Sequence, residues 1–204
     1  MVPQVIEKTD VRFTWQDYQT WPDDGRWELI NGVAWAMSPA PTIRHQTVAA
    51  RFYSRLERAL EGRPCQPFIA PTDVRLSDFD VVQPDVLVVC DKAKITPSHI
   101  EGAPDVVVEV LSPTTAALDQ REKKALYERA GVREYVLVHP TDLVASRFLL
   151  LPDTGRFDAG TLFSATETLI FITLDNLEIP LWEVFEVDGP GAVAVKTGPG
   201  RPVP

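Results

Sequence analysis

Cysteine and histidine are both scarce in this chain of 204 residues, which holds 2 cysteines and 3 histidines. Cys65 and Cys90 have neither the spacing of paired metal ligands nor the density of a disulfide-rich secreted scaffold. This scarcity argues against a cysteine-based structural metal site, and a chain of this length needs no disulfide framework. We expect both cysteines to be small, buried, apolar residues of a protein in a reducing compartment.

Long hydrophobic runs are also missing, since no stretch approaches the roughly 18 apolar residues of a membrane span. The N-terminus lacks a basic segment followed by an apolar run, which is the pattern of a secretory signal. The sequence therefore predicts a cytoplasmic protein with no membrane partner.

Positive charge is in deficit, because 20 Lys and Arg residues face 29 Asp and Glu residues and leave a net charge of −9. Phosphate binding needs clustered Lys and Arg, so this balance excludes a general attraction of the whole surface to nucleic acid. It still permits a local basic stripe beside an acidic metal pocket.

The remaining composition, 45% hydrophobic and 24% charged, is that of an ordinary globular domain. We expect one domain over residues 1–187 and a disordered tail over 188–204, a segment rich in Gly and Pro without apolar periodicity. The order of elements predicts an α/β layer fold. Strands are expected at 26–37 about an Asn31-Gly32 turn, and at 67–76, 84–90, 104–111, 133–138 and 143–150, with helices at 42–61 and 116–131.

The helix expected at 42–61 carries two stripes. Its apolar stripe holds Val48, Phe52, Leu56 and Leu60, at four-residue steps. Its basic stripe holds Arg44, Arg51, Arg55 and Arg58, about 120° around the helix. The basic stripe is either an ordinary solvated face or a surface that contacts nucleic-acid phosphates.

Two acidic residues interrupt strands that are otherwise apolar. Asp85 shares a pleat face with Leu87 and Val89, and Glu109 shares one with Val107 and Leu111. Burying an unpaired charge costs several kcal/mol, so both carboxylates need a cation, donors or solvent. Either acid alone suits a strand edge or a capping position. Together they could bind a hard divalent cation such as Mg²⁺.

A lysine is expected near these acids. Projected on an α-helix, Lys123 falls on the inward stripe with Leu126 and Tyr127, whereas Lys124 turns toward water with Gln120, Arg121 and Glu128. The plain alternative is a lysine stem that covers the core and keeps its ammonium in solvent.

Several linked runs resemble one known family. They are Gly102 to Pro113, Lys123 to Tyr127, Ala130 to Tyr135, Trp27 to Gly32 and Gln83 to Val86. In order and spacing they resemble the Uma-type restriction endonuclease family, a branch of the PD-(D/E)XK nuclease superfamily, over roughly residues 12–185. The resemblance implies a restriction-endonuclease-like mixed β-sheet core flanked by helices.

The resemblance also implies a site. Asp85 and Glu109 would bind Mg²⁺ or Mn²⁺ with help from a backbone carbonyl beside Glu109, and Glu28 would complete the acidic cluster. The usual superfamily lysine follows the second acid by two residues, but Leu111 stands there. The resemblance instead assigns the role of the catalytic lysine to Lys123, on the following helix. Without the resemblance, Glu28 reads as an exposed partner of Arg26 in the hairpin.

Two further residues are candidates for support. His45, at the start of the long helix, is either part of the site or a satisfied core histidine. Asp119, one turn before Lys123, could orient the lysine ammonium or simply stabilise a helix N-terminus.

The function that follows is phosphodiester hydrolysis by a metal-dependent endonuclease acting on nucleic acid, with DNA as the expected substrate. A nuclease fold that binds nucleic acid or protein without cleaving is the alternative, favoured by the acidic net charge and the displaced lysine. A homodimer is a further candidate assembly.

Overall fold

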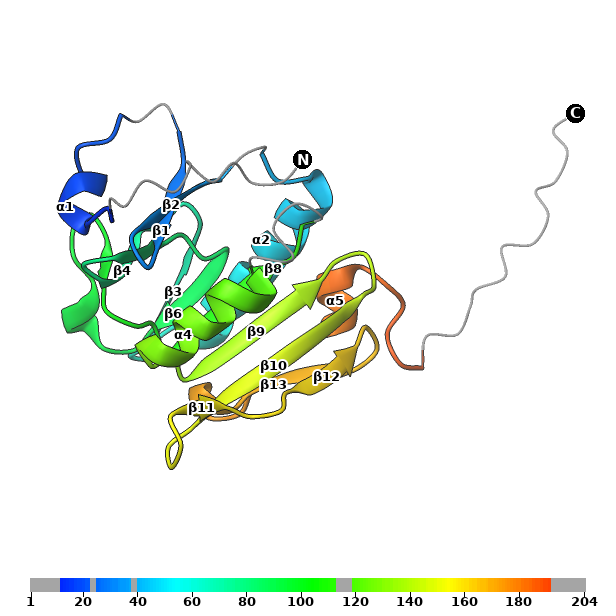
Figure 1. Cartoon of the computed structure of the whole chain (residues 1–204). Helices are drawn as coiled ribbons and strands as arrows, with labels where there is room; N and C mark the ends of the chain where they lie inside the picture. The colour runs from blue at the N-terminus through cyan, green and yellow to red at the C-terminus, as the bar shows by residue number, and fades with distance from the viewer. Residues whose placement is uncertain (1–11, 23–24, 38–39, 113–118, 192–204) are drawn as a thin grey trace, which may run out of the picture.

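A mixed sheet forms the framework of the computed structural model, which describes residues 12–22, 25–37, 40–112 and 119–191 (Figure 1). Its strand order is β11-β10-β9-β8-β6-β3, with β12 paired to β10. Only the β8–β9 pair in this sheet is parallel. The strands are β3 (Gln66–Ile69), β6 (Val86–Val89), β8 (Val106–Val110), β9 (Glu134–His139), β10 (Val144–Leu151), β11 (Arg156–Phe157) and β12 (Thr161–Ser164).

A smaller sheet of order β2-β1-β5-β4-β7 lies beside it. Its strands are β1 (Trp27–Ile30), β2 (Val33–Ala36), β4 (Val74–Ser77), β5 (Asp80–Val82) and β7 (Ile100–Glu101). The predicted turn is confirmed: Asn31 and Gly32 join β1 to β2 with φ angles of 54° and 76°. Both residues therefore have the positive φ that a tight hairpin requires.

Helices cover both faces of the larger sheet. Helix α2 (Ile43–Leu60) begins after Thr42, whose side chain accepts a hydrogen bond from the His45 amide. Its apolar stripe is buried against Val86 and Val108. On the other face, helix α4 (Lys124–Ala130) packs Leu126 and Tyr127 with Leu87 and Val107. The apolar strand runs predicted a sheet covered on both faces, and that prediction is confirmed.

Several smaller elements complete the described chain. Thr14 caps helix α1 with a capping box. These elements are α1 (Trp15–Tyr18), η1 (Lys92–Lys94), β13 (Thr168–Phe171), η3 (Ile172–Leu174), β14 (Leu177–Pro180) and α5 (Leu181–Phe185). None of the helices in the described residues is long and apolar enough to cross a membrane. Residues 192–204, most of the predicted tail, lie outside the described residues.

Two predicted elements differ in the structure. The strand expected at 67–76 is divided between β3 and β4, which belong to different sheets. Pro71 stands between them and has no N–H to continue a ladder. The helix expected at 116–131 begins as the π-helix η2 (Asp119–Lys123), continues as α4 and ends at Gly131 with φ 87°. Residues 116–118 are outside the described part.

The cysteines correct a sequence prediction. Cys65 and Cys90 are half-buried and form a disulfide, rather than two separate buried thiols. The cause is strand register: β3 pairs with β6 through Gln66 and Val89, and the next opposed positions are Cys65 and Cys90. Directly opposed side chains lie on the same face of a sheet. The cysteine content thus gives no argument for a reducing compartment.

Removing this disulfide is expected to lower the free energy of unfolding. The bridge closes a loop with a sequence separation of 25. A loop of this size restricts the unfolded chain by roughly 3–4 kcal/mol. The Cys65→Ser, Cys90→Ser double variant should lose about that much in urea unfolding. Reductant should destabilise the wild type similarly and leave the double variant unaffected. Equal unfolding midpoints with and without reductant in the wild type would contradict the bridge.

Candidate active site

Asp85 and Glu109 stand opposite each other on neighbouring strands. Strand β6 is antiparallel to β8, with Val86 opposite Val108, so the next opposed positions are Asp85 and Glu109. Opposed residues share a sheet face, which brings the two carboxylates together. The Val110 amide fixes Asp85 by donating to its Oδ2 at 2.8 Å. Asp85 keeps 19% of its side chain exposed, whereas Glu109 keeps 4%.

Lys123 lies between two buried carboxylates. Its Nζ is 2.9 Å from Glu28 Oε1 and 3.1 Å from Glu109 Oε1. All three side chains are almost completely buried. The prediction that Lys123 faces inward is confirmed, and its ammonium does not reach solvent as the plain alternative required. The structure thus joins Glu28, Glu109 and Lys123 in one ion cluster beside Asp85.

Glu28 comes from the smaller sheet, on β1. The backbone N–H of Gln83 donates to Glu28 Oε1 at 2.9 Å. Arg26, the surface partner that the hairpin suggested, instead donates to the Gln83 side-chain oxygen at 2.8 Å. Glu28 is therefore an internal contact between the smaller sheet and η2, not an exposed hairpin residue.

Tyr127 is a site residue that the sequence reasoning missed. Its hydroxyl donates to Glu109 Oε1 at 2.6 Å. Burial, followed by the charges of Glu109 and Glu28, raises the pKa of Tyr127 well above its usual value. The hydroxyl therefore remains a donor at physiological pH. Its signal was its position one helical turn after Lys123 on the same inward stripe.

The two supporting candidates have different outcomes. His45 is buried at the start of α2, and its Nε2 lies 3.1 Å from Asp85 Oδ2. It is thus a core histidine and a neighbour of the candidate site at once. The backbone of Asp119 begins η2. Its side chain is outside the described part, so its predicted role stays a prediction.

Comparison with known proteins identifies the family. The Uma2 family model, described as "Putative restriction endonuclease", matches residues 15–170. This chain belongs to the Uma2 family.

Two further proteins are similar to this Uma2 protein. A crystal structure of a "putative nuclease belonging to DUF820" from Anabaena variabilis matches with a TM-score of 0.70 and 16% identity, covering 85% of this chain and 98% of that one. The fold is thus restriction-endonuclease-like, as the sequence resemblance implied. A Synechocystis protein, slr1290, is 28% identical over 134 residues, which are 63% of this chain and 69% of the relative.

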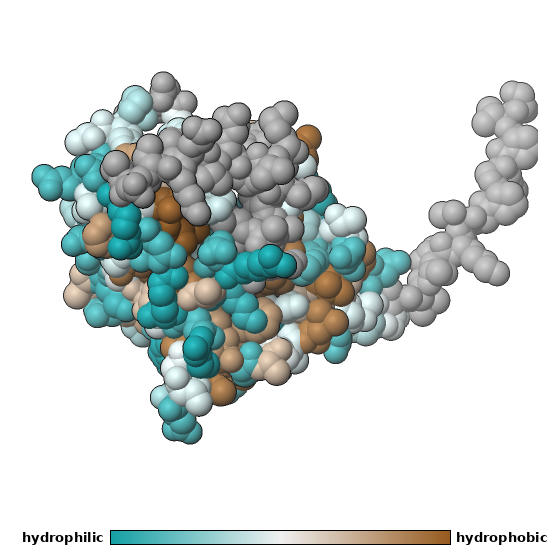
Figure 2. All heavy atoms as spheres, viewed as in Figure 1, coloured by the Kyte–Doolittle hydropathy of each residue, from teal (hydrophilic) through white to brown (hydrophobic). Residues whose placement is uncertain are grey.

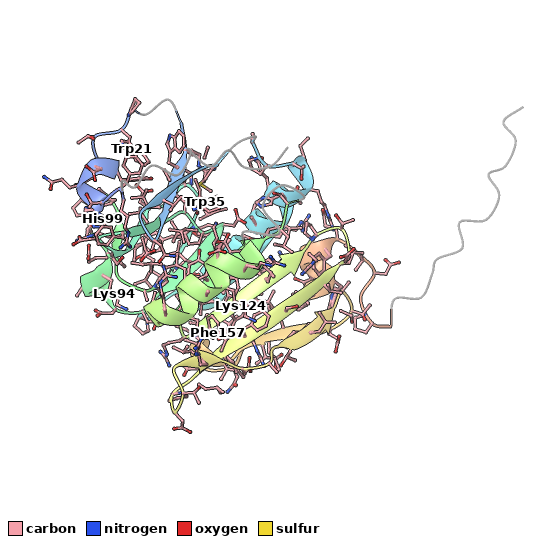
Figure 3. All side chains as sticks on the ribbon, viewed as in Figure 1. Trp21, Trp35, Lys94, His99, Lys124 and Phe157 are labelled. Atoms are coloured by element: carbon pink, nitrogen blue, oxygen red, sulfur yellow. A yellow bond between two sulfur atoms is a disulfide. The ribbon has the colours of Figure 1, made fainter. Side chains whose placement is uncertain are left out.

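The side chain of Lys124 in this Uma2 protein does not point where the sequence predicted. It was expected to point to water, but its Nζ lies 3.5 Å from the centre of the Phe148 ring. Figure 3 labels Lys124 on α4. Burial lowers the pKa of Lys124. Lys124 is the first residue of α4, and its side chain packs on the Phe148 ring of β10, a contact between segments distant in the sequence that a helical projection does not reveal.

The basic stripe on α2 has partners within the protein. Arg44 donates to the Phe185 carbonyl at 2.7 Å, Arg51 pairs with Glu186, and Arg55 donates to Glu183 at 3.0 Å. Arg58 is exposed. Three of the four arginines therefore hold the α5 end of the chain, a structural role that the sequence did not indicate. Phosphate contact by this stripe stays a prediction.

The site was tested for its fit to a divalent cation. Within the described residues, no three His, Cys, Asp or Glu side chains gather as a metal cluster. Mg²⁺ needs fewer, since it commonly takes one or two carboxylates plus waters and substrate phosphates. The contacts of Asp85 with Val110 and His45 both use Oδ2, and Oδ1 accepts no hydrogen bond from the described residues. Asp85 and Glu109 therefore fit a Mg²⁺ or Mn²⁺ site.

Proposed function

We propose that this Uma2 protein is a metal-dependent endonuclease that hydrolyses phosphodiester bonds, with DNA as the substrate. One observation carries the proposal: the Lys123 ammonium lies 3.1 Å from Glu109, and Glu109 stands opposite Asp85 on the adjacent strand. The two acids can supply the oxygen ligands of a divalent ion, and the lysine supplies a positive charge beside them.

The residues of the chain divide the work. Asp85 and Glu109 would hold Mg²⁺ or Mn²⁺. When bound, the ion supplies Lewis acidity to a phosphoryl oxygen and lowers the pKa of a bound water. Lys123 positions the attacking water or offsets negative charge on the phosphate. Tyr127 and Lys123 both orient Glu109 through Oε1. His45 and the Val110 amide orient Asp85. No covalent enzyme intermediate is expected.

The test is a cleavage assay with supercoiled plasmid and with short single- and double-stranded oligonucleotides. Purified protein is incubated across Mg²⁺ and Mn²⁺ concentrations, with EDTA as the metal-free arm and Asp85→Ala as the control variant. We expect divalent-dependent cleavage by the wild type only. Cleavage that persists equally in Asp85→Ala would point to a contaminating nuclease and contradict the proposal.

A second candidate function is a nuclease fold that binds nucleic acid or another protein without cleaving it. The observation in its favour is that Lys123 is buried and engaged with both Glu28 and Glu109, as a purely structural ion cluster would be. Binding of oligonucleotides without cleavage at any metal concentration would favour this function over the first.

Partners and location belong to the same proposal. Nucleic acid as substrate favours the cytoplasm. A homodimer would need a shared apolar surface, but the large exposed apolar side chains belong to different elements, and Figure 2 shows separate apolar patches on the visible face. The large exposed apolar side chains are those of Val33, Ile43, Leu151, Leu162 and Ile172. Light scattering with and without DNA measures the assembly.

Tyr127→Phe is expected to reduce cleavage by about 10-fold or more, because residues that orient metal ligands typically contribute 10- to 100-fold. The ring still fills its buried site, so the fold should be kept. Tyr53→Phe is the matched control, since Tyr53 also donates to a glutamate, Glu57, but at the surface. The measurement is the cleavage rate against metal concentration. Equal rates for the two variants would remove Tyr127 from the site.

A further inference from the structure

A polar cavity of about 280 Å³ lies next to the candidate active site. Its walls come from the β3–β4 connection, from Gln83 and from the segment 95–100. Gln83 links the cavity to the site. Its backbone N–H donates to Glu28 Oε1, and Gln83 also lines the cavity. Pro71, also in the wall, follows Ala70, whose amide donates to the Asp85 carbonyl. The cavity therefore adjoins residues that contact Glu28 and Asp85.

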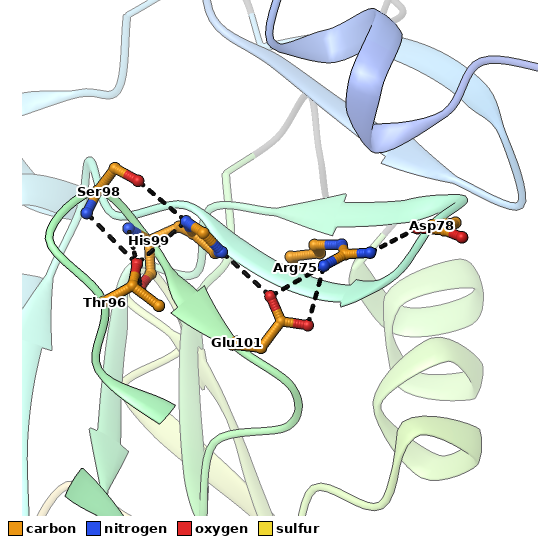
Figure 4. Close-up of polar contacts among 6 residues, drawn as sticks. All are labelled: Arg75, Asp78, Thr96, Ser98, His99 and Glu101. Atoms are coloured by element: carbon orange, nitrogen blue, oxygen red, sulfur yellow. Dashed lines mark hydrogen bonds and ion pairs between the residues drawn. The ribbon is translucent and has the colours of Figure 1, made fainter. Parts of the chain in front are cut away.

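A hydrogen-bond network holds one wall in place (Figure 4). His99 Nε2 lies 3.1 Å from Glu101, which also pairs with Arg75 at 3.1 Å. His99 Nδ1 lies 3.0 Å from the Ser98 hydroxyl. Glu101 is acceptor-only, so Nε2 carries the proton that faces it. The Trp15 ring packs on His99 with centroids 4.8 Å apart. The wall is thus preformed, not dependent on a ligand for its shape.

The cavity has little capacity left to donate hydrogen bonds. The Gln83 side-chain nitrogen already donates to Asp73 Oδ1 and to the Tyr18 hydroxyl. The hydroxyl of Thr72 donates to the Ile69 carbonyl. Asp73 accepts its hydrogen bonds from the described residues only at Oδ1, so Oδ2 remains an acceptor. Burial and the Asp73 charge raise the pKa of Tyr18, which keeps it a donor to Asp73.

These features define the ligand. Because no Lys or Arg is among the described residues that line the cavity, a phosphate group is disfavoured there. Phe68, Ile95 and Ile100 supply apolar surface, with an aromatic ring for stacking. Asp73 Oδ2 has two lone pairs that can accept, so it suits a planar, uncharged group that presents two adjacent N–H donors to that one oxygen. Among nucleobases, guanine presents two such donors side by side, N1–H and the 2-amino group.

We propose that this cavity receives an unpaired guanine base, with Asp73 accepting from its donor edge. The proposal rests on the proposed function, because the base would belong to the nucleic-acid substrate whose backbone reaches Asp85 and Glu109. Recognition of an unstacked base by stacking and by hydrogen bonds to its edge is common to proteins that bind single strands.

The test is calorimetric titration of the full chain with guanosine, inosine, adenosine and uridine in EDTA, where no cleavage can occur. We expect guanosine to bind at least about 10-fold more tightly than inosine, which lacks the 2-amino group, since each such hydrogen-bonded contact discriminates by about 10-fold or more. Amide chemical shifts should change at Gln83, Thr96 and His99.

Asp73→Asn should lower guanosine affinity by about 10-fold or more, because it replaces Oδ2 with a donor while Oδ1 still accepts from Tyr18 and Gln83. Asp142→Asn is the control, since Asp142 is exposed beside His139 and does not line the cavity. Equal affinity for all four nucleosides, or shifts elsewhere, would overturn the guanine site. That result would leave metal-dependent cleavage untouched. Guanosine binding by a protein that cleaves nothing would instead reject only the nuclease.

Discussion

Lys123→Ala is expected to lower the cleavage rate by on the order of 10²-fold or more while nucleic-acid binding changes little. The ammonium has no lone pair for a metal, so its contribution falls on charge that develops during reaction. Its removal also leaves Glu28 and Glu109 buried without their cation. Breaking such a buried pair typically costs about 3–5 kcal/mol, so the variant should also melt at a lower temperature. Rates must therefore be measured below its melting transition.

Arg121→Ala is the matched control for Lys123→Ala. Arg121 belongs to the same π-helix and loses the same charge, but its side chain is exposed. Lys124 is unsuitable as a control because it packs over Phe148. Similar small effects of the Lys123 and Arg121 substitutions would contradict the catalytic assignment of Lys123, even in an active nuclease.

Asp85→Asn should abolish most divalent-dependent cleavage, by about 10²-fold or more, because metal stabilisation of the reacting charge is worth several kcal/mol. It should also abolish thermal stabilisation by the metal. An ion that binds only the folded state raises the melting temperature of the wild type with increasing concentration. The asparagine oxygen can still accept from the Val110 amide, so the local structure should survive.

Asp142→Asn serves as the control for this experiment. Asp142 also has a histidine neighbour, His139, but its side chain is 72% exposed. Its metal response should match that of the wild type. A wild-type melting curve that does not move over millimolar Mg²⁺ and Mn²⁺ would argue against a metal site at Asp85 and Glu109.

The sequence predicted the framework well because its signals were local. Apolar runs indicated the buried strands, four-residue apolar steps indicated helix α2, and Asn31-Gly32 marked the hairpin turn. The acids of the site were visible for the same reason, since a carboxylate within an apolar strand is anomalous. These features depend on neighbours in the chain, and so a single sequence contains them.

The remaining features depend on contacts between distant segments. The ion pair of Glu28 with Lys123 joins strand β1 of the smaller sheet to the helix η2. Only the family resemblance suggested a role for Glu28. Lys124 packs on Phe148 of β10, a residue distant in the chain, so a projection of its own helix alone did not place it correctly. Register between β3 and β6 brought Cys65 to Cys90, and spacing along the chain does not reveal register.

The arginines on α2 have a consequence for how nucleic acid could be held. Because Arg51 and Arg55 already pair with Glu186 and Glu183, this stripe has few cations left to displace the condensed ions around a polynucleotide. Counterion release sets the steepness with which affinity falls as salt is added. A stripe neutralised in this way would give only a shallow salt dependence. Affinity would then come mainly from a divalent ion held at the proposed site and from contacts with the bases.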